Sequence, residues 1–262
     1  MHKDDDPTIP LVLYSGGMDS TLMLYCELLN RSVDTLYVTA NAAEGRDVME
    51  KRAREKAMSW FLDSDIGKDL KGRVLVDRAI NLDQTLIQVK GYKMIQPLMW
   101  LIAGLMAFDK DRHSELMIGY IVGDTAPIKI TELEAFWRNA YALMHWCKPE
   151  NAPPVRFPLI ERGYDKLKVL ADLPLELADK IWVCERPKKK DNGSYHYCKT
   201  CASCRTHLNA LDNYKHKYHG WDYGAWVLHN RRIKTEEVQS LDDIGPEEKN
   251  DGPGPGIISA GS

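Results

Sequence analysis

The sequence predicts an α/β protein with an open parallel sheet and helices on both faces of that sheet. Short apolar runs rich in β-forming residues predict strands at residues 9–14, 34–40, 73–77 and 115–120. Apolar or amphipathic stretches between them predict helices at residues 22–29, 48–61 and 94–108. Strands that alternate with helices in this way pair in parallel and are joined by right-handed crossovers.

A glycine-rich turn follows the first expected strand and precedes the first expected helix. It reads Ser15-Gly16-Gly17-Met18-Asp19-Ser20-Thr21. Glycine lets the backbone turn sharply and bring its N–H groups near a phosphate, and the helix N-terminus adds unpaired N–H donors. Ser15, Ser20 and Thr21 add hydroxyl donors, whereas Asp19 is suited to capping the helix or to holding Mg²⁺ beside a phosphate. The turn differs from the GxxxxGK[ST] and GxGxxG phosphate loops.

Polar residues beyond other expected strands belong to the same edge of the sheet. In an open parallel sheet, ligands bind outside the carboxyl ends of the strands. Thr39, at the end of the second strand, and the polar loop at residues 41–45 should therefore border the cleft at Ser15. Asp124, five residues past Gly119, should lie on this edge too, unless it only caps a turn or a helix.

The second half of the chain is less regular. Residues 131–147 predict a helix with an aromatic face, and Thr131 and Glu134 have the spacing of a capping box at its start. Three prolines in residues 151–158 predict a break, and residues 165–171 begin another helix. Residues 181–184 form a short strand or an extended piece that enters a cysteine-rich region.

Composition excludes several classes of protein. The 262 residues include 44% hydrophobic and 28% charged residues with a net charge of −3, so no basic footprint for bulk nucleic-acid binding is present. No apolar stretch reaches the roughly 18–20 residues that span a bilayer. Residues 1–7 are polar and acidic, so a signal peptide is not expected. We therefore expect a cytoplasmic protein that acts on neither membranes nor nucleic acid.

Four of the six cysteines form a C-x13-C-x2-C-x2-C pattern: Cys184, Cys198, Cys201 and Cys204. In a cytosolic chain this spacing favours a metal site over disulfide bonds. Four thiolates fit a closed structural Zn²⁺ site, which would order a loop that buries few apolar residues. A [4Fe–4S] cluster also takes four cysteines and stays an alternative. Cys26 and Cys147 are expected to be ordinary buried thiols.

Together, the SGGMDS string and the cysteine pattern resemble the QueC family, the 7-cyano-7-deazaguanine synthases among the PP-loop ATP pyrophosphatases. The resemblance spans about residues 9–215 and includes Gly119 with Asp124, Pro158-Leu159 with Lys166, and Arg205 after the last cysteine. It implies a Rossmann-like fold of the adenine nucleotide alpha hydrolase type, with ATP, Mg²⁺, structural Zn²⁺ and a homodimer.

The resemblance also implies roles for individual residues. ATP would contact the turn, which comprises Ser15, Gly16, Gly17, Met18, Asp19, Ser20 and Thr21, together with Thr39. Asp19 and Asp124 would hold Mg²⁺ directly or through water, and Lys166 and Arg205 would be cations that face the phosphates. The implied substrate is 7-carboxy-7-deazaguanine, whose carboxylate is adenylated and then attacked by ammonia to give an amide and, after a second activation, a nitrile.

The identity of the attacking amine stays open at this point. Similar proteins in antiviral operons join the activated deazaguanine to a protein amine, so a protein acceptor is an expected alternative partner. Segments at residues 40–46, 94–98 and 127–131 depart from the family pattern. Two other interpretations also stay open, namely a PP-loop tRNA-modifying enzyme and a non-catalytic nucleotide-binding subunit of a defence complex.

The expected organisation has three parts. Residues 1–180 form the ATP-binding α/β domain, and residues 181–232 form the four-cysteine zinc module with an aromatic region. Residues 233–262 are rich in glycine, proline and acidic side chains, which is typical of a flexible tail.

Overall fold

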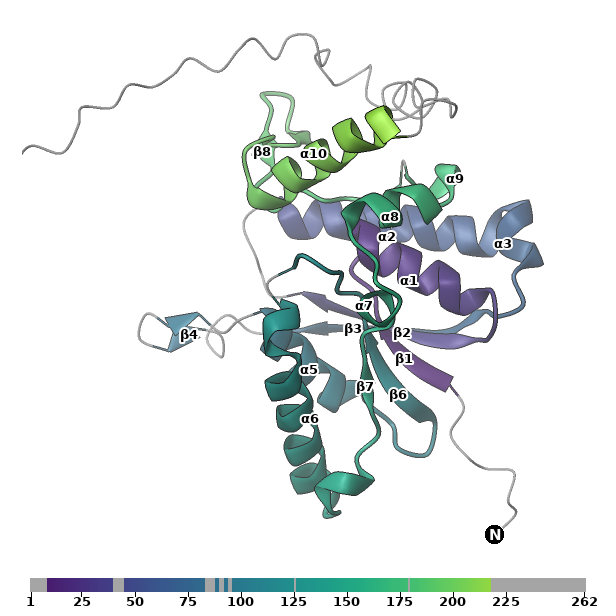
Figure 1. Ribbon diagram of the computed structural model, residues 1–262, viewed down its shortest axis with the longest axis vertical. Coiled ribbons are helices and arrows are strands. Elements are labelled where there is room, and N and C mark those ends of the chain that lie inside the picture. The colour runs from purple at the N-terminus through teal and green to yellow at the C-terminus, as the bar shows by residue number, and fades with distance from the viewer. Residues whose placement is uncertain are drawn as a thin grey trace, which may run out of the picture.

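The computed structural model describes residues 9–39, 45–82, 88–89, 92–93, 96–124, 126–178 and 180–217 (Figure 1). Several expectations lie outside these ranges: the polar loop at residues 41–44, the aromatic residues 218–226 and the tail at residues 233–262. Within the described ranges, none of the helices combines the length and the apolar content needed to cross a membrane.

A parallel five-stranded sheet with the order β3-β2-β1-β6-β7 forms the centre of the fold. Its strands are β1 Ile9–Leu13, β2 Val33–Thr39, β3 Val74–Asn81, β6 His113–Ile118 and β7 Val155–Arg156. Each neighbouring pair is parallel, which confirms the expected open parallel sheet. The chain adds β2 and β3 on one side of β1 and then β6 and β7 on the other. The crevice at this reversal, between β1 and β6, is where such sheets bind ligands.

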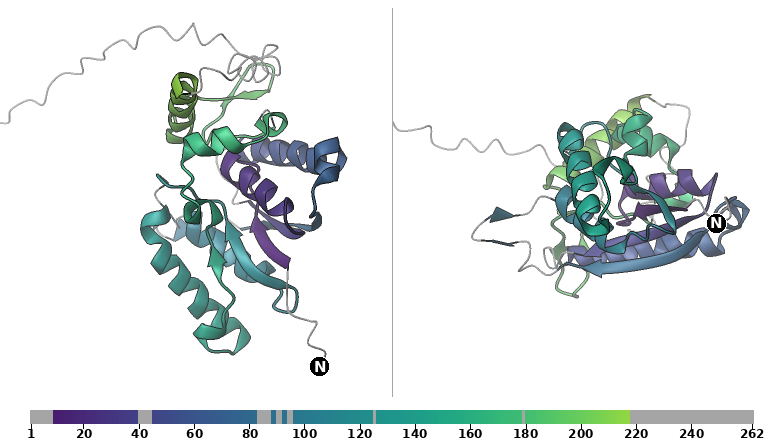
Figure 2. Two further views of the ribbon diagram at one scale, coloured as in Figure 1. Left: turned by 45° about the vertical axis from the view of Figure 1, so that its right-hand side comes forward. Right: turned by 90° about the horizontal axis from the view of Figure 1, so that it is seen from below.

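Helices cover both faces of the sheet, as expected (Figures 1 and 2). One face carries α1 Met18–Leu28, α2 Arg46–Asp63 and α8 Lys166–Asp172, and the other carries α5 Gln96–Ala107 and α6 Ile130–His145. Alternate side chains of a strand point to opposite faces. Val12 accordingly packs in the first core, whereas Leu11 and Leu13 pack in the second.

Shorter elements complete the described chain. The remaining α-helices are α3 Asp65–Asp69, α7 Pro158–Glu161, α9 Leu175–Ala178 and α10 Ala202–Lys217, with 3-10 helices η1 Ala126–Lys129 and η2 Pro149–Asn151. Two small antiparallel hairpins pair β4 Gln88–Val89 with β5 Tyr92–Lys93, and β8 Lys188–Lys189 with β9 Tyr195–His196. Helix α10 packs on α8, and its Ala210 joins the first core, so the cysteine-bearing segment lies against the α/β domain (Figure 2).

Strand β7 lies where the sequence predicted only a break. Pro153 and Pro154 precede it, and proline cannot donate to a ladder, so such a strand is tolerated at the edge of a sheet. The proline carbonyls nevertheless accept hydrogen bonds, from Leu116 N–H to Pro154 at 3.0 Å and from Trp137 Nε1–H to Pro153 at 2.7 Å. The segment that leads into the edge strand is therefore held to β6 and to α6 by the backbone carbonyls of these prolines.

Two local predictions need correction. The capping box at Thr131 is wrong, because α6 begins at Ile130 after an N-cap at Lys129 that makes no side-chain bond. Thr131 then lies inside the first turn, where its hydroxyl is past the capping position. The third strand continues to Asn81 instead of ending at residue 77. Residues 181–184 form no strand, which leaves the second of the two alternatives that the sequence allowed for them.

Candidate functional site

The turn between β1 and α1 is held in shape by its own hydroxyl groups. Helix α1 begins after an N-cap at Gly17. The Gly17 carbonyl accepts hydrogen bonds from Thr21 Oγ1 at 2.7 Å and from Ser20 Oγ at 3.1 Å. Ser15 Oγ lies 3.0 Å from Ser20 Oγ and accepts from Gly17 N–H at 3.3 Å. The turn is therefore preorganised before any anion arrives.

Two glycines allow the segments around the turn to approach closely. Gly16 has a φ of +80°, and a Cβ atom there would lie 2.8 Å from the backbone nitrogen of Arg54 in α2. A Cβ atom at Gly119, just past β6, would lie 3.0 Å from Ser20 Cα. Gly16 leaves no room for a side chain, and a side chain at Gly119 would be tight against the backbone of Ser20, so the end of β6 rests directly on the first turn of α1.

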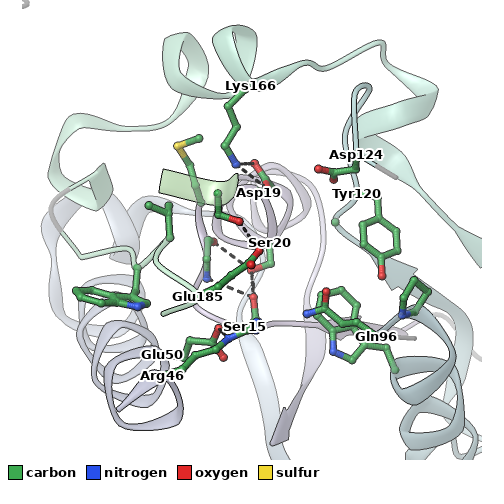
Figure 3. A pocket seen from close by; sticks show the side chains of 18 residues that line it. Ser15, Asp19, Ser20, Arg46, Glu50, Gln96, Tyr120, Asp124, Lys166 and Glu185 are labelled. Carbon is green, nitrogen blue, oxygen red and sulfur yellow. Dashed lines mark hydrogen bonds and ion pairs between the residues drawn. The ribbon is translucent and has the colours of Figure 1, made fainter. Parts of the chain in front are cut away.

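A cavity of about 450 Å³ opens at this edge of the sheet (Figure 3). Its walls come from the turn, the first residues of α2 and α5, the loop after β6, the start of α8 and the cysteine-bearing segment. The loops after β1 and β6 thus meet in one cavity at the point where the strand order reverses, as the sequence predicted for Ser15 and Asp124. The size suits a nucleotide or a small substrate.

Lys166 and two carboxylates face one another in this cavity. Lys166 Nζ lies 2.9 Å from both carboxylate oxygens of Asp19. Asp19 is the second residue of α1, which has Gly17 as its N-cap, and it pairs with a lysine from α8. Of the two roles that the sequence allowed for Asp19, capping the helix and holding Mg²⁺, the structure excludes the first. Asp124 Oδ2 accepts from Ile121 N–H at 3.1 Å. Burial raises the pKa of Asp124, and the charge of Asp19 adds to this. Two carboxylates that share one cation are suited to binding a divalent metal ion.

The opposite wall of the cavity carries a second group of charges. Arg46 and Glu50, in the first turns of α2, form an ion pair at 2.7 Å. Burial raises the pKa of Glu50, although Arg46 partly offsets that effect. Glu185 lines the same side, and Ser203 Oγ–H donates to its carboxylate. Sequence analysis missed these residues; the signal that could have found them is their position near expected helix starts and beside the cysteines.

Several residues singled out in the sequence lie outside the cavity lining, among them Gly16 and the buried Thr21 of the turn, both expected to contact ATP. Thr39 ends β2, and its carbonyl accepts from Leu82 N–H at 2.9 Å. Arg205 is exposed on α10. Cys26 and Cys147 are partly exposed instead of buried. By contrast, Ser15, Gly17, Met18, Asp19 and Ser20, with Asp124 and Lys166, all line the cavity.

The four cysteines of the repeated pattern come together. The sulfur atoms of Cys184, Cys198, Cys201 and Cys204 all lie within 4.8 Å of one another, and all four residues are buried. Backbone N–H groups donate to three of these sulfurs, for example from Cys198 to Cys184 at 3.3 Å and from Cys201 to Cys198 at 3.2 Å. Such bonds favour thiolates. The expected four-cysteine site that can bind a metal is confirmed.

Trp182 connects this cluster to the turn. Its backbone N–H donates to the Gly16 carbonyl at 3.2 Å, and its indole N–H donates to the Cys184 carbonyl at 2.8 Å. The indole ring stacks on Tyr197 with centroids 4.3 Å apart and also lines the cavity. Trp182 thereby joins the backbone at Cys184 to the backbone of the turn.

Comparison with known proteins adds little to the geometry of the site. No protein-family model matches this chain, and no curated protein matches it. Among solved structures, the U34-tRNA thiolase NcsA from Methanococcus maripaludis with its [4Fe–4S] cluster is similar at 15% identity and a TM-score of 0.41. The alignment covers 94% of this chain and 79% of that chain. Likeness at this level leaves the metal and the substrate to be inferred from this chain's own residues.

Proposed function

We propose that this chain is a PP-loop ATP pyrophosphatase that adenylates the carboxylate of 7-carboxy-7-deazaguanine and transfers the acyl group to an amine. The observation that carries the proposal is the meeting of the SGGMDS turn with Asp19, Asp124 and Lys166 in one cavity at the reversal of strand order. The resemblance of the turn, Lys166 and the cysteine pattern to the QueC family supports the substrate.

The first step needs an anion site and a cation. A carboxylate oxygen attacks the α-phosphorus of ATP, the bond from that phosphorus to the bridging oxygen breaks, and pyrophosphate leaves with the electron pair. Negative charge builds on the departing group, so N–H donors at the start of α1 stabilise it. Lys166 can move its ammonium group from Asp19 to the phosphates. Asp19 and Asp124 would hold Mg²⁺, which would neutralise phosphate charge.

The second step consumes the mixed anhydride. An amine nitrogen attacks the acyl carbon, the bond from that carbon to the AMP oxygen breaks, and the nitrogen loses one proton. The products are an amide and AMP. Ammonia and a protein N-terminal amine both satisfy this chemistry. Glu50 lines the cavity, and a carboxylate with a raised pKa is suited to receiving the proton.

The four cysteines would hold one structural Zn²⁺. Zn–S bonds of about 2.3 Å place the sulfur atoms of a tetrahedral site about 3.8 Å apart. The Sγ atoms of Cys198 and Cys204 are 4.0 Å apart, which supports a single ion. A cubane cluster puts iron and sulfide between the cysteines and separates them further. With four protein ligands the ion has no open position for a substrate, so its contribution would be to order the segment that contacts the turn.

ATP–pyrophosphate exchange tests the proposal. The protein should exchange labelled pyrophosphate into ATP when 7-carboxy-7-deazaguanine and Mg²⁺ are present, and not without the carboxylate. Intact-mass analysis of the reaction with ammonia, and separately with co-expressed neighbouring proteins, should then identify the amide or the protein adduct. Exchange at the same rate with and without 7-carboxy-7-deazaguanine would refute this substrate. Exchange dependent on unmodified tRNA would instead favour the tRNA-modifying interpretation.

A further inference from the structure

Three aromatic rings form a continuous stack beside the cavity. Trp100 of α5 lies parallel to Tyr120, with centroids 5.5 Å apart and an interplanar angle of 16°. Tyr120 in turn lies parallel to Phe157, with centroids 6.2 Å apart and an angle of 19°. Trp100 and Tyr120 line the cavity, and the buried Phe157 supports them from behind. The stack is therefore a rigid, apolar wall of the cavity.

The Tyr120 hydroxyl can form hydrogen bonds that none of the described residues supplies. Tyr120 is only 7% exposed, and its oxygen has no hydrogen-bond partner among the described residues. Burial raises the pKa of Tyr120, so the group stays a neutral O–H that can donate and accept. A buried hydroxyl without a partner is destabilising. Tyr120 lines the cavity, and its hydroxyl oxygen is covered in the free protein, so a ligand that shifts the surrounding side chains can supply that partner.

Gln96 supplies further hydrogen-bonding groups on the same wall. It is exposed, begins α5 and lines the cavity. Figure 3 places Gln96 below the hydroxyl of Tyr120, across the cavity from Arg46 and Glu50. Its amide offers one acceptor and two N–H donors. A flat apolar surface with a hydroxyl and an amide is suited to a planar heterocycle whose edge carries both N–H and C=O.

The position of the wall relative to the charged residues indicates which planar group it receives. Asp124 is near enough for its charge to add to the raised pKa of Tyr120, and Asp124 also interacts with Asp19 and Lys166. The carboxylate that attacks the α-phosphorus must reach this charged group. The ring that bears that carboxylate then lies beside the charged group, in the cavity that Tyr120 and Trp100 line together with Asp124.

We propose that Trp100, Tyr120 and Gln96 form the subsite for the heterocycle of the acid that is adenylated. Trp100, the outer ring of the stack, contacts the face of the heterocycle, and the Tyr120 hydroxyl and the Gln96 amide bond to its lactam edge. This inference rests on the proposed function, because it assumes that the second substrate is a heteroaromatic carboxylate. It assigns specificity to residues in and near the segment at residues 94–98, where the chain departs from the QueC pattern.

Tyr120→Phe is the sharpest test, because it removes only the hydroxyl. We expect the KM for 7-carboxy-7-deazaguanine to rise roughly tenfold, as for one lost hydrogen bond, with the KM for ATP unchanged. The midpoint of thermal unfolding should stay the same or rise, since an unpaired buried hydroxyl is lost. Tyr37→Phe is the matched control: Tyr37 is 4% exposed, its hydroxyl also lacks a partner among the described residues, and it does not line the cavity. It should change neither KM.

Equilibrium dialysis with 7-carboxy-7-deazaguanine, and separately with ATP, distinguishes failure of the subsite from failure of the proposed function. Weaker binding of the heterocycle by Tyr120→Phe and by Trp100→Leu would support the subsite even if no exchange activity were found. The subsite is overturned if the wild-type protein does not bind the heterocycle. It is also overturned if these variants weaken ATP binding alone, since the wall would then hold the adenine ring.

Discussion

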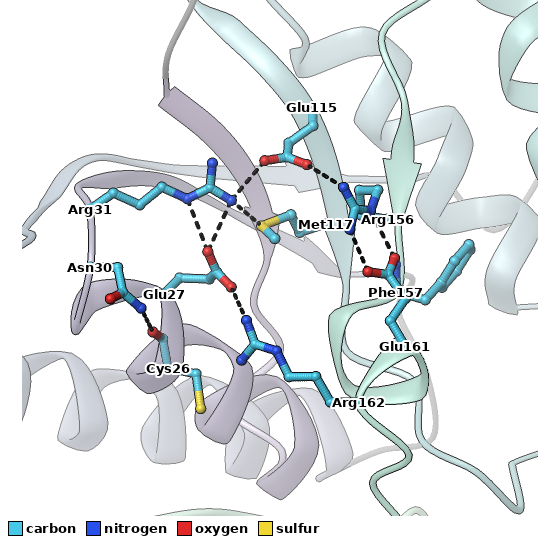
Figure 4. Close-up of polar contacts among 10 residues, drawn as sticks. All are labelled: Cys26, Glu27, Asn30, Arg31, Glu115, Met117, Arg156, Phe157, Glu161 and Arg162. Carbon is cyan, nitrogen blue, oxygen red and sulfur yellow. Dashed lines mark hydrogen bonds and ion pairs between the residues drawn. The ribbon is translucent and has the colours of Figure 1, made fainter.

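Two polar regions on the described part of the chain differ in how completely their groups are paired. At the C-terminal end of α1, six side chains of alternating charge form a connected network (Figure 4): Glu27, Arg31, Glu115, Arg156, Glu161 and Arg162. Each of them contacts at least one opposite charge. In the cavity at the N-terminal end of α1, one lysine faces two carboxylates and the Tyr120 hydroxyl lacks a described partner. In the adjoining cysteine-bearing segment, four sulfur atoms lie close enough together to hold one metal ion.

The difference suggests that the two ends of α1 have different roles, with stability at the C-terminal end and ligand binding at the N-terminal end. The network ties α1 to β6, β7 and α7, and α7 leads through residues 162–165 to Lys166. Its pairs are complete without a ligand, so its contribution is to stability and to the path of the backbone. The groups of the cavity, by contrast, are proposed to be completed by an anion, a metal ion and a planar ligand. Variants of the two regions should therefore separate stability from activity.

The largest effect is expected for Asp19→Asn. Removing one carboxylate charge leaves Lys166 without its ion pair and weakens the place for Mg²⁺, so exchange should fall at least about 100-fold. Unfolding by urea should change little, because Asp19 is only partly buried in an open cavity. Asp69→Asn, an exposed acid at the end of α3, is the control and should retain full activity. Normal exchange by Asp19→Asn would remove this residue from the mechanism.

A second large effect is expected for Cys201→Ser. Structural zinc sites have binding free energies on the order of 10 kcal/mol, so the loss of one ligand should destabilise the cysteine-bearing segment by several kcal/mol. Elemental analysis should find close to one zinc per chain in the wild type and far less in the variant. Exchange should also fall, because Trp182 links Cys184 to Gly16.

Cys147→Ser is the matched control for this experiment, since Cys147 is a partly exposed thiol outside the cluster. It should retain both zinc and activity. Full zinc content in Cys201→Ser would contradict the proposed ligand set. Iron with labile sulfide in the wild-type protein would show that the cysteines hold an iron–sulfur cluster instead of zinc.

The division between the two regions also decides what could be predicted from the sequence. The turn at residues 15–21 was recognisable because glycines, hydroxyls and a helix start are adjacent in the chain. The cysteines were recognisable because three of them recur at a fixed interval. Arg46, Trp100 and Trp182 were missed, because the fold brings them to the cavity from segments that are distant in sequence.

Some local signals were misleading for physical reasons. Prolines 153 and 154 suggested a break, yet an edge strand needs only their carbonyls on one side. Thr131 and Glu134 had capping-box spacing, but a 3-10 turn leads into α6 one residue earlier. The charged network could not be predicted at all, since each of its residues alone looks like an ordinary surface charge.

The smallest effect is expected for Glu27→Gln, and it should be the reverse of Asp19→Asn. Glu27 is 4% exposed and contacts both Arg31 and Arg162, so its neutralisation leaves two cations poorly paired. Because both arginines reach solvent, we expect a loss of about 1–2 kcal/mol in the free energy of unfolding, well below that for a fully buried pair. Urea denaturation measures this loss, and the KM for ATP should not change. Glu150→Gln, an exposed acid near the far end of α6, should leave stability unaltered. If Glu27→Gln instead lowered exchange without lowering stability, the network would belong to the catalytic apparatus, and the separation between the two ends of α1 would be wrong.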